Sequence, residues 1–187
     1  MKGIIFTSFI DLVEEKFGLE MLEDVISSAK LPNNGAYTAV GTYDHSQLIE
    51  MVMILSEKSA IPATDLVKAF GEHLFGVLSK TYPDLLEGLD SAFELLENVD
   101  GFIHIEVLKL YPDAKPPSFD CRRIDDNQLE MIYHSPRGMG DVAEGLILGC
   151  AAYYSQNIEV QREKKEPDNG ETERFLLTLR SGAKPNE

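Results

Sequence analysis

The chain has 187 residues, 43% of them hydrophobic, and a formal net charge of -15, which suits one domain with a packed core and an internal pocket. The negative charge argues against nucleic-acid binding that is driven by counterion release. No apolar run approaches the roughly 18 residues of a membrane span, and acidic residues interrupt the N-terminal apolar stretch before any signal cleavage site, so we expect a cytoplasmic protein.

The first half of the chain has apolar residues at helical spacing. The expected helices cover residues 4–17, 19–29, about 44–55, about 64–78 and 85–98. Gly18 is expected to end the first helix, and Asp44 or Ser46 to cap the third. Thr64 with Asp65 is expected to open the fourth helix, after a turn at residues 31–35 and an ambiguous stretch that follows it.

A single histidine lies in the apolar segment that follows. We interpret this segment as a helix from about Asp100, which can cap its start, to Tyr111, where Pro112 favours a stop. The helix places four residues on one buried stripe: His104, Val107, Leu108 and Tyr111. A strand is the alternative, but the charged Glu106 and Lys109 favour the helix, where both lie away from the stripe. Such a histidine is either a hydrogen-bonded core residue or a ligand.

The second half of the chain, after Pro116-Pro117, has the period-two pattern of strands. The expected strands cover residues 118–124, 128–135, 158–165 and 174–180. Asp141 is expected to cap a helix to about Gln156, in which Gly145 and Gly149 permit a close backbone approach. The predicted fold class is α+β, with a mainly helical N-terminal part packed on a C-terminal part that has a roughly four-stranded antiparallel sheet. A turn at residues 167–170 and a frayed tail from Ser181 complete the prediction.

The two cysteines and a short basic run are expected to have structural roles. Cys121 and Cys150 are too few and too far apart for a zinc site, and we expect buried, reduced thiols. Arg162, Lys164 and Lys165 form a basic run that acidic residues interrupt, which is typical of a solvated strand edge.

The second predicted strand leads into the segment Tyr133-His-Ser-Pro-Arg137. In extended chain Tyr133, Ser135 and Arg137 point to one side and His134 to the other. Three hydrogen-bond donors, one of them a charged guanidinium, can bind a carboxylate or a phosphate. The alternative is an ordinary sheet end with a capping serine and a surface arginine, and this pattern alone does not decide between the two.

Together these features resemble the H-NOX family, the haem nitric oxide/oxygen binding domains. The resemblance covers nearly the whole chain and rests on these residues: the opening Met1-Lys-Gly-Ile-Ile, His104 in a helix, the two prolines about a dozen residues later, and Tyr133, Ser135 and Arg137 as Y-x-S-x-R. It implies one domain over residues 1–187, with a helical subdomain over about 1–62, a haem-ligating helix and sheet subdomain over about 63–180, and a tail at 181–187.

The resemblance implies a buried pocket for haem b, and a sensor rather than an enzyme. His104 would be the proximal ligand of a ferrous haem iron, and Tyr133, Ser135 and Arg137 would bind the propionates. Pro117 and Ile5 would help to hold the macrocycle out of plane. An apolar pocket, one imidazole and one anion-binding cluster agree with what a haem requires.

A departure from the family pattern concerns the distal side of the haem. Members that bind oxygen have a tyrosine where this chain has Val142, and Leu74 likewise stands where a polar residue can occur. With Phe9, Leu78 and Leu146 nearby, the distal side would be apolar. Because bound oxygen gains from a hydrogen-bond donor more than nitric oxide or carbon monoxide does, we predict binding of the latter two with oxygen excluded.

The resemblance also implies a signalling mechanism, in which nitric oxide weakens the bond between iron and His104 until the histidine detaches. The haem then relaxes and the N-terminal helices shift against the sheet. The expected partner is a separately encoded signalling histidine kinase or cyclic-di-nucleotide enzyme.

The sequence is also compatible with another iron ligand and with other functions. His73 is the rival iron ligand, whereas His45 is expected to be exposed near a helix start and His134 to point away from the anion-binding residues. A haem redox enzyme is one alternative, although the predicted distal residues contain no acid/base pair. A haem-free module that binds a small ligand or partner in the same pocket is another.

Overall fold

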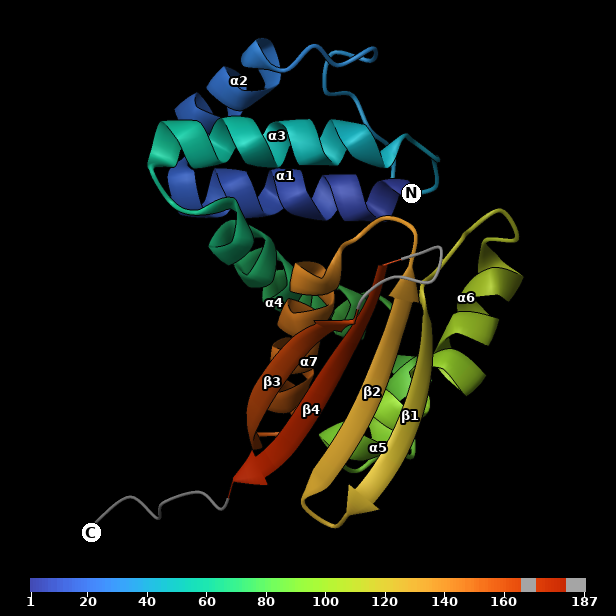
Figure 1. Cartoon of the computed structure of the whole chain (residues 1–187). Coiled ribbons are helices and arrows are strands. Elements are labelled where there is room, and N and C mark those ends of the chain that lie inside the picture. Colours follow the sequence, from blue (N-terminus) through green and yellow to red (C-terminus); the bar gives the residue numbers. More distant parts are fainter. Residues whose placement is uncertain (166–170, 181–187) are drawn as a thin grey trace, which may run out of the picture.

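A four-stranded antiparallel sheet and a group of N-terminal helices form the two parts of the molecule (Figure 1). The structure is a computed structural model that describes residues 1–165 and 171–180. The helices α1 to α3 lie together at one end, and α4 runs from them to the face of the sheet that α7 covers (Figure 1). The predicted α+β class is therefore confirmed.

The N-terminal helices follow the predicted segments closely. They are α1 (Gly3–Phe17), α2 (Leu19–Ser28), α3 (His45–Ser59) and α4 (Ala63–Thr81). Gly18 ends α1 with a φ of +86°, a conformation that suits glycine because it has no Cβ. Asp44 caps α3 by accepting a hydrogen bond of 2.9 Å from the Ser46 backbone N–H. The fourth helix begins at Ala63, one residue before the predicted start.

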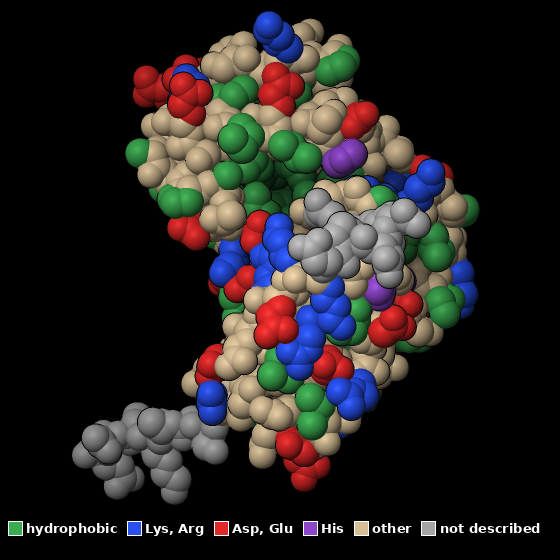
Figure 2. All heavy atoms as spheres, in the orientation of Figure 1, with side chains coloured by type: hydrophobic (Ala, Val, Ile, Leu, Met, Phe, Trp, Pro, Cys, Tyr) green, Lys and Arg blue, Asp and Glu red, His purple; other side chains and the backbone are tan. Residues whose placement is uncertain are grey.

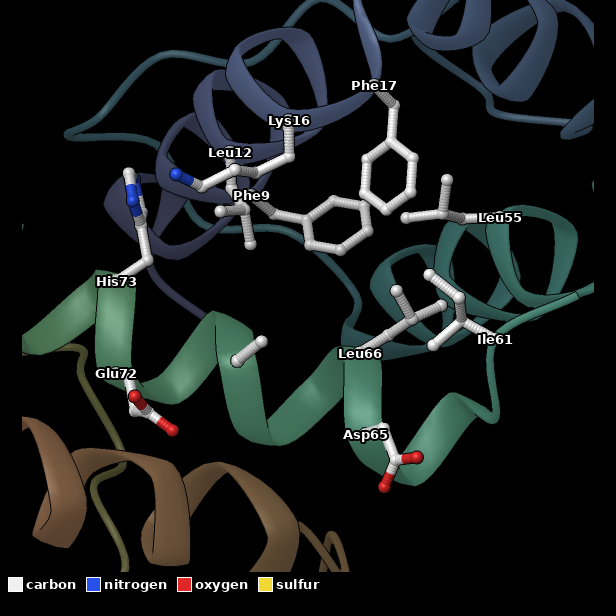
Figure 3. A pocket seen from close by; sticks show the side chains of 11 residues that line it. Phe9, Leu12, Lys16, Phe17, Leu55, Ile61, Asp65, Leu66, Glu72 and His73 are labelled. Carbon is white, nitrogen blue, oxygen red and sulfur yellow. The ribbon is translucent and has the colours of Figure 1, made fainter. Parts of the chain in front are cut away.

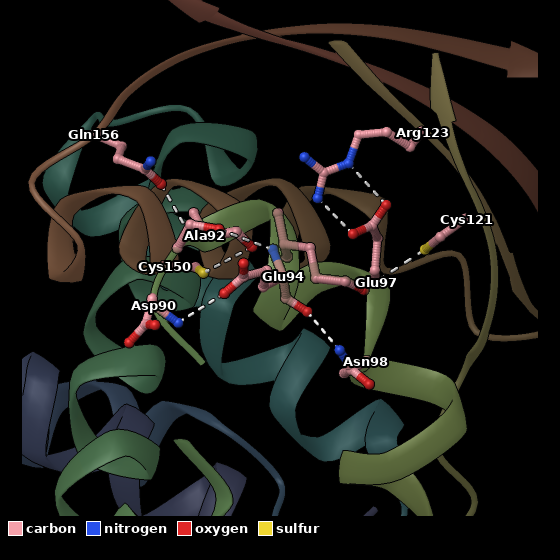
Figure 4. Close-up of polar contacts among 11 residues, drawn as sticks. Asp90, Ala92, Glu94, Glu97, Asn98, Cys121, Arg123, Cys150 and Gln156 are labelled. Carbon is pink, nitrogen blue, oxygen red and sulfur yellow. Dashed lines mark hydrogen bonds and ion pairs between the residues drawn. The ribbon is translucent and has the colours of Figure 1, made fainter. Parts of the chain in front are cut away.

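The helix predicted over residues 85–98 is wrong, because the chain turns within it. A short 3-10 helix, η1 (Pro83–Leu86), is followed by Gly88 at a φ of +78° and then by α5 (Ala92–Glu97). The Ser91 hydroxyl accepts from the Glu94 N–H at 3.2 Å and so caps α5. Figure 4 shows further polar contacts of this helix, including the 2.8 Å bond that the Ala92 N–H donates to Gln156.

The sheet contains β1 (Ser118–Asp125), β2 (Gln128–Ser135), β3 (Asn157–Lys165) and β4 (Glu171–Arg180), in the order β1-β2-β4-β3. The predicted strands and the first hairpin are confirmed. On β2 the buried residues alternate with half-buried ones: Leu129, Met131, Tyr133 and Ser135 face inward. The turn predicted at residues 167–170 and the tail from 181 lie outside the described residues.

Two hydrophobic clusters fill the interior, and α4 contributes to both. Leu66, Phe70 and Leu74 belong to the cluster beneath the N-terminal helices, whereas Phe75 belongs to the cluster against the sheet. Leu146 of α7 (Gly140–Tyr153) packs against both clusters. The division at residues 62 and 63 stays a prediction, since one helix spans both clusters.

The helices α4 and α7 approach closely at glycine residues. A Cβ on Gly145 would collide with the backbone oxygen of Lys68 and lie 2.8 Å from Gly71 Cα, and one on Gly149 would lie 2.7 Å from Phe75 Cβ. The predicted close approach at Gly145 and Gly149 is therefore confirmed.

Gly145→Ala should destabilise the fold by about 1–3 kcal/mol, because the backbones of two packed helices must separate to admit the methyl group. The control is Gly76→Ala on α4, where a Cβ would meet nothing within 4 Å, and where the higher helix propensity of alanine should add roughly 0.5–1 kcal/mol. Urea denaturation of both variants measures the difference. Equal midpoints would contradict the packing argument.

The N-terminus of α7 and Arg162 differ from the predictions, whereas Lys164 and Lys165 are exposed on the edge strand β3 as predicted. The residue before α7 is Met139, the helix ends at Tyr153, and Asp141 does not cap it. Instead Asp141 and Glu173 both form ion pairs with Arg162, whose side chain is only 16% exposed. The interpretation of Arg162 as part of a solvated edge is wrong, because its guanidinium joins β3 and β4 to the first turn of α7.

The two cysteines are free, as predicted, and Cys150 is buried, whereas Cys121 is only half-buried. Burial raises the pKa of the Cys150 thiol to about 12 and that of the Cys121 thiol to about 11. Both residues therefore stay largely as protonated thiols near neutral pH.

Membrane-spanning helices are absent from the described ranges, residues 1–165 and 171–180. Each helix there is too short or too polar to cross a bilayer.

Candidate functional site

His104 is the first residue of α6 (His104–Leu110), which continues from a π-helical turn, η2 (Val99–Ile103). The predicted helix is confirmed, and it ends at Leu110 before Tyr111 and Pro112. None of the residues of η2 or α6 is buried. Leu108 is 38% exposed, so its place on a buried stripe is wrong. The segment lies beside β1, outside the packed helices (Figure 1).

The imidazole of His104 is held by a carboxylate one helical turn earlier. Its Nδ1 lies 3.2 Å from Asp100 Oδ1, and an ionised carboxylate only accepts, so Nδ1 is the donor. Nε2 is then left with a free lone pair. Burial lowers the pKa of His104, and the contact with Asp100 offsets part of this. Asp100 thus orients a neutral imidazole rather than capping the helix, which the prediction missed although the i, i+4 spacing indicates it.

The predicted anion-binding residues come together at the end of β2. Tyr133 is 2% exposed and Ser135 is 3% exposed, and both face the interior. The Ser135 hydroxyl accepts from the backbone N–H of Arg137 at 3.3 Å. Burial raises the pKa of the Tyr133 phenol, which therefore stays a neutral hydrogen-bond donor. His134 points to the other side, as predicted, with its Nε2 3.1 Å from Asp120.

Two further contacts link these residues to the histidine helix. The Phe119 ring lies between two site residues, with its centroid 6.1 Å from that of His104 and 5.4 Å from that of Tyr133. The Arg137 guanidinium donates 2.7 Å to the backbone oxygen of Lys115, in the loop that reaches Pro117 and β1. Phe119 was missed from the sequence, although it follows Pro117 by two residues on a strand with alternating burial.

The predicted distal residues belong to one hydrophobic cluster. Its buried members include Phe9 and Leu74, with the half-buried Ile5, Leu78, Val142 and Leu146 packed against it. Phe9 and Leu74 come from α1 and α4, and Val142 from the first turn of α7. Residues far apart in the sequence thus form a continuous apolar region.

His73 lies in a groove between α1, α3 and α4, which the predicted distal residue Phe9 also lines (Figure 3). The groove has a volume of about 450 Å³, and its lining includes Phe9, Leu12 and Lys16 but none of Tyr133, Ser135 or Arg137. Hydrophobic side chains surround a hollow between the N-terminal helices and the sheet on the face in Figure 2. This position makes His73 a weaker candidate ligand than His104. His45 is the first residue of α3, near a helix start as predicted, but it is half-buried rather than exposed.

The sequence model of the Haem-NO-binding family matches residues 2–162. The chain belongs to the H-NOX family. H-NOX domains bind haem and act as gas sensors, and the family resemblance of the sequence is thereby confirmed.

Solved H-NOX structures match over nearly the full length. The unliganded Fe(II) H-NOX protein from K. algicida is 36% identical with a TM-score of 0.90, and each chain is covered in full. The H-NOX from Shewanella woodyi, solved with IWP-051 in the Fe(II)CO state, is 39% identical over 99% of this chain and 98% of that chain, with a TM-score of 0.83.

A curated relative is the soluble guanylate cyclase gcy-35 of Caenorhabditis elegans. It is 25% identical over 175 residues, which cover 89% of this chain. The chain spans only 25% of that relative's length.

The residues present fit a haem. A histidine that ligates a metal usually donates its other ring N–H to a carboxylate or a carbonyl, and His104 does so to Asp100. The arrangement also provides an arginine, a tyrosine and a serine for propionates, and an apolar cluster for the macrocycle. Phe102 of η2 and Ile105, Leu108 and Leu110 of α6 are exposed apolar residues, so this segment is only partly covered by the rest of the chain.

Proposed function

We propose that this protein is a sensor of nitric oxide that also binds carbon monoxide and excludes oxygen. The observation that carries the proposal is the contrast between the two sides of the site. A neutral imidazole oriented by Asp100 provides the ligand, whereas the distal candidates are all apolar, with Val142 and Leu74 in one hydrophobic cluster.

A ferrous haem b would supply an iron atom that binds the gas. His104 would hold the iron through Nε2, and Asp100 orients its ring. Tyr133, Ser135 and Arg137 would hold the propionates by charge-assisted hydrogen bonds. Ile5 and Pro117 would contact the macrocycle. Val142, Leu74, Phe9, Leu78 and Leu146 exclude polar groups from the gas, so that oxygen finds no donor.

We expect His104 to pass the effect of gas binding to α6. None of the residues of α6 is buried, and a change in the position of this helix would alter the packing between the N-terminal helices and the sheet. The partner would be a signalling histidine kinase or a cyclic-di-nucleotide enzyme that recognises one of the two arrangements. The chain itself would catalyse no reaction, because the apolar distal residues offer no acid/base pair.

The absorption spectrum of the reduced, haem-loaded protein tests this function. We expect a Soret band that shifts with nitric oxide and with carbon monoxide and does not shift in air. Val142→Tyr should raise oxygen affinity about tenfold, since a hydrogen bond contributes roughly 1–1.5 kcal/mol.

The matched control is Val142→Phe, which adds the same ring without the hydroxyl. A wild-type protein that binds oxygen as readily as carbon monoxide would contradict the proposed selectivity. An equal gain in the tyrosine and phenylalanine variants would exclude the hydrogen bond as its cause. A protein that stays colourless when supplied with haem would favour the haem-free alternative.

A further inference from the structure

The helix that carries His104 is held at its C-terminal end by side chains from other parts of the chain. The Tyr111 hydroxyl lies 2.8 Å from that of Tyr82, at the end of α4. The ammonium group of Lys2 lies 5.0 Å from the centre of the Tyr111 ring, within the range of a cation–π contact. None of the residues of α6 is buried, so these contacts add to the few that fix its position.

The same lysine reaches the loop just beyond α6. Lys2 Nζ donates to Asp113 Oδ1 at 3.2 Å and to Thr42 Oγ1 at 2.9 Å. The Thr42 hydroxyl in turn donates to Asp113 Oδ2 at 2.5 Å. These hydrogen bonds hold the pKa of the Asp113 carboxyl below its usual value, so it stays ionised. Although Asp113 is on the surface, the Lys2 side chain is only 12% exposed, which limits its freedom to rearrange.

The position of Lys2 connects this contact to the N-terminal helices. Lys2 pairs with Thr42 as an isolated β-bridge, and it directly precedes α1, in which Ile5 lies in the first turn. Lys2, Asp113 and Arg137 also line one pocket of about 170 Å³. The contact between Lys2, Thr42 and Asp113 therefore lies where α1, the end of α6 and the anion-binding residues meet.

We infer that Lys2 and Asp113 form a tether that positions α6, and with it His104, relative to α1. This inference rests on the proposed function of His104 and adds residues that control it. When His104 moves, α6 pulls on Asp113 and Tyr111, and the tether passes the displacement to the first turn of α1. Lys2 and Asp113 are thus positioning residues, which act on the iron only through the helix.

The test uses Lys2→Met and Asp113→Asn in the full chain, with and without haem. Lys2→Met keeps the apolar stem and removes the charge. Amide hydrogen exchange of residues 105–111 should become roughly two- to fivefold faster in each variant, the effect of losing one partly exposed ion pair. In the haem-loaded protein, the change from a six- to a five-coordinate nitric oxide spectrum should accelerate by a similar factor.

Lys58→Met is the matched control, because Lys58 forms a 3.4 Å ion pair with Asp24 that joins α3 to α2, away from α6. It should leave both measurements unchanged, and Lys2→Arg should retain the wild-type values. In the double variant, the combined effect should be smaller than the sum of the effects of Lys2→Met and Asp113→Asn, because both substitutions remove the same contact between Lys2 and Asp113.

The outcomes separate this inference from the proposed function. Unchanged exchange in α6 overturns the tether, whether or not the protein binds a gas. Faster exchange with an unchanged rate of conversion overturns its coupling to His104. A protein that never binds haem refutes the proposed function, whereas the exchange experiment without haem still tests whether Lys2 and Asp113 hold the helix.

Discussion

Replacing His104 with glycine is expected to remove most of the haem from the purified protein. The imidazole is the only candidate iron ligand in the proposed site, and Asp100 orients its ring. Even partners of a metal ligand contribute about 10–100-fold to metal affinity, so loss of the ligand itself should cost at least about 100-fold. Haem titration of the unliganded protein, followed by Soret absorbance, measures this loss.

Two other histidines provide controls for the same experiment. His134→Gly removes a side chain that contacts Asp120 and Thr172 on the outer side of the sheet, and should leave haem affinity unchanged. His73→Gly removes the rival ligand in the groove of α4. If His73→Gly loses haem while His104→Gly keeps it, the assignment of the ligand is wrong.

The same variant tests the proposed release of His104. Imidazole added to His104→Gly should restore the Soret band, but the new ligand has no covalent link to α6. Nitric oxide should then displace the free imidazole without altering amide exchange in residues 105–111. If the response of α6 or of a partner still depends on nitric oxide, detachment of the histidine is not the signal.

Arg162→Met is expected to lower the free energy of unfolding by about 3 kcal/mol. Arg162 forms ion pairs with Glu173 and Asp141, and the Glu173 side chain is only 2% exposed. Removing one partner of a buried pair leaves the other charge without compensation in a poorly solvated place. One buried oxygen of Glu173, Oε1, already has no hydrogen-bond partner among the described residues. Groups that could replace the guanidinium beside Glu173 are therefore scarce.

The control lies on the same two strands. Arg180 pairs with Glu159, but these side chains are 53% and 44% exposed, and Arg180→Met should cost less than about 1 kcal/mol. Urea denaturation at constant ionic strength gives both values. A cost for Arg162→Met no larger than that for Arg180→Met would show that burial adds nothing to the Arg162 ion pairs.

Much of the fold followed from patterns with a local cause. The period-two alternation that places Tyr133 and Ser135 on one side of β2 is a property of extended chain. The stop at Gly18 and the cap at Asp44 depend on residues next to the helix ends. Such features need no knowledge of distant contacts, and all of them are present in the structure.

The incorrect predictions involve residues whose partners are far away in the sequence or compete with a local role. Asp100 is a residue type that often caps helices, but its carboxylate contacts His104 instead. Arg162 looks like a surface residue until β3, β4 and α7 come together around it. The apolar stretch at residues 85–98 has a helical pattern, yet Gly88 and the Ser91 cap divide it.

The sequence by itself determined the family, because the resemblance that rests on His104 and the Y-x-S-x-R residues is confirmed by the family match, and the same resemblance led to the proposed site. Only the tertiary structure decided which side chains support them. Phe119 against His104 and Tyr133, and Lys2 against Asp113, are contacts made once the helices and strands have packed, whereas Asp100 contacts His104 within one helical turn. Local patterns encode periodicity, whereas these contacts depend on how elements distant in the chain meet in space.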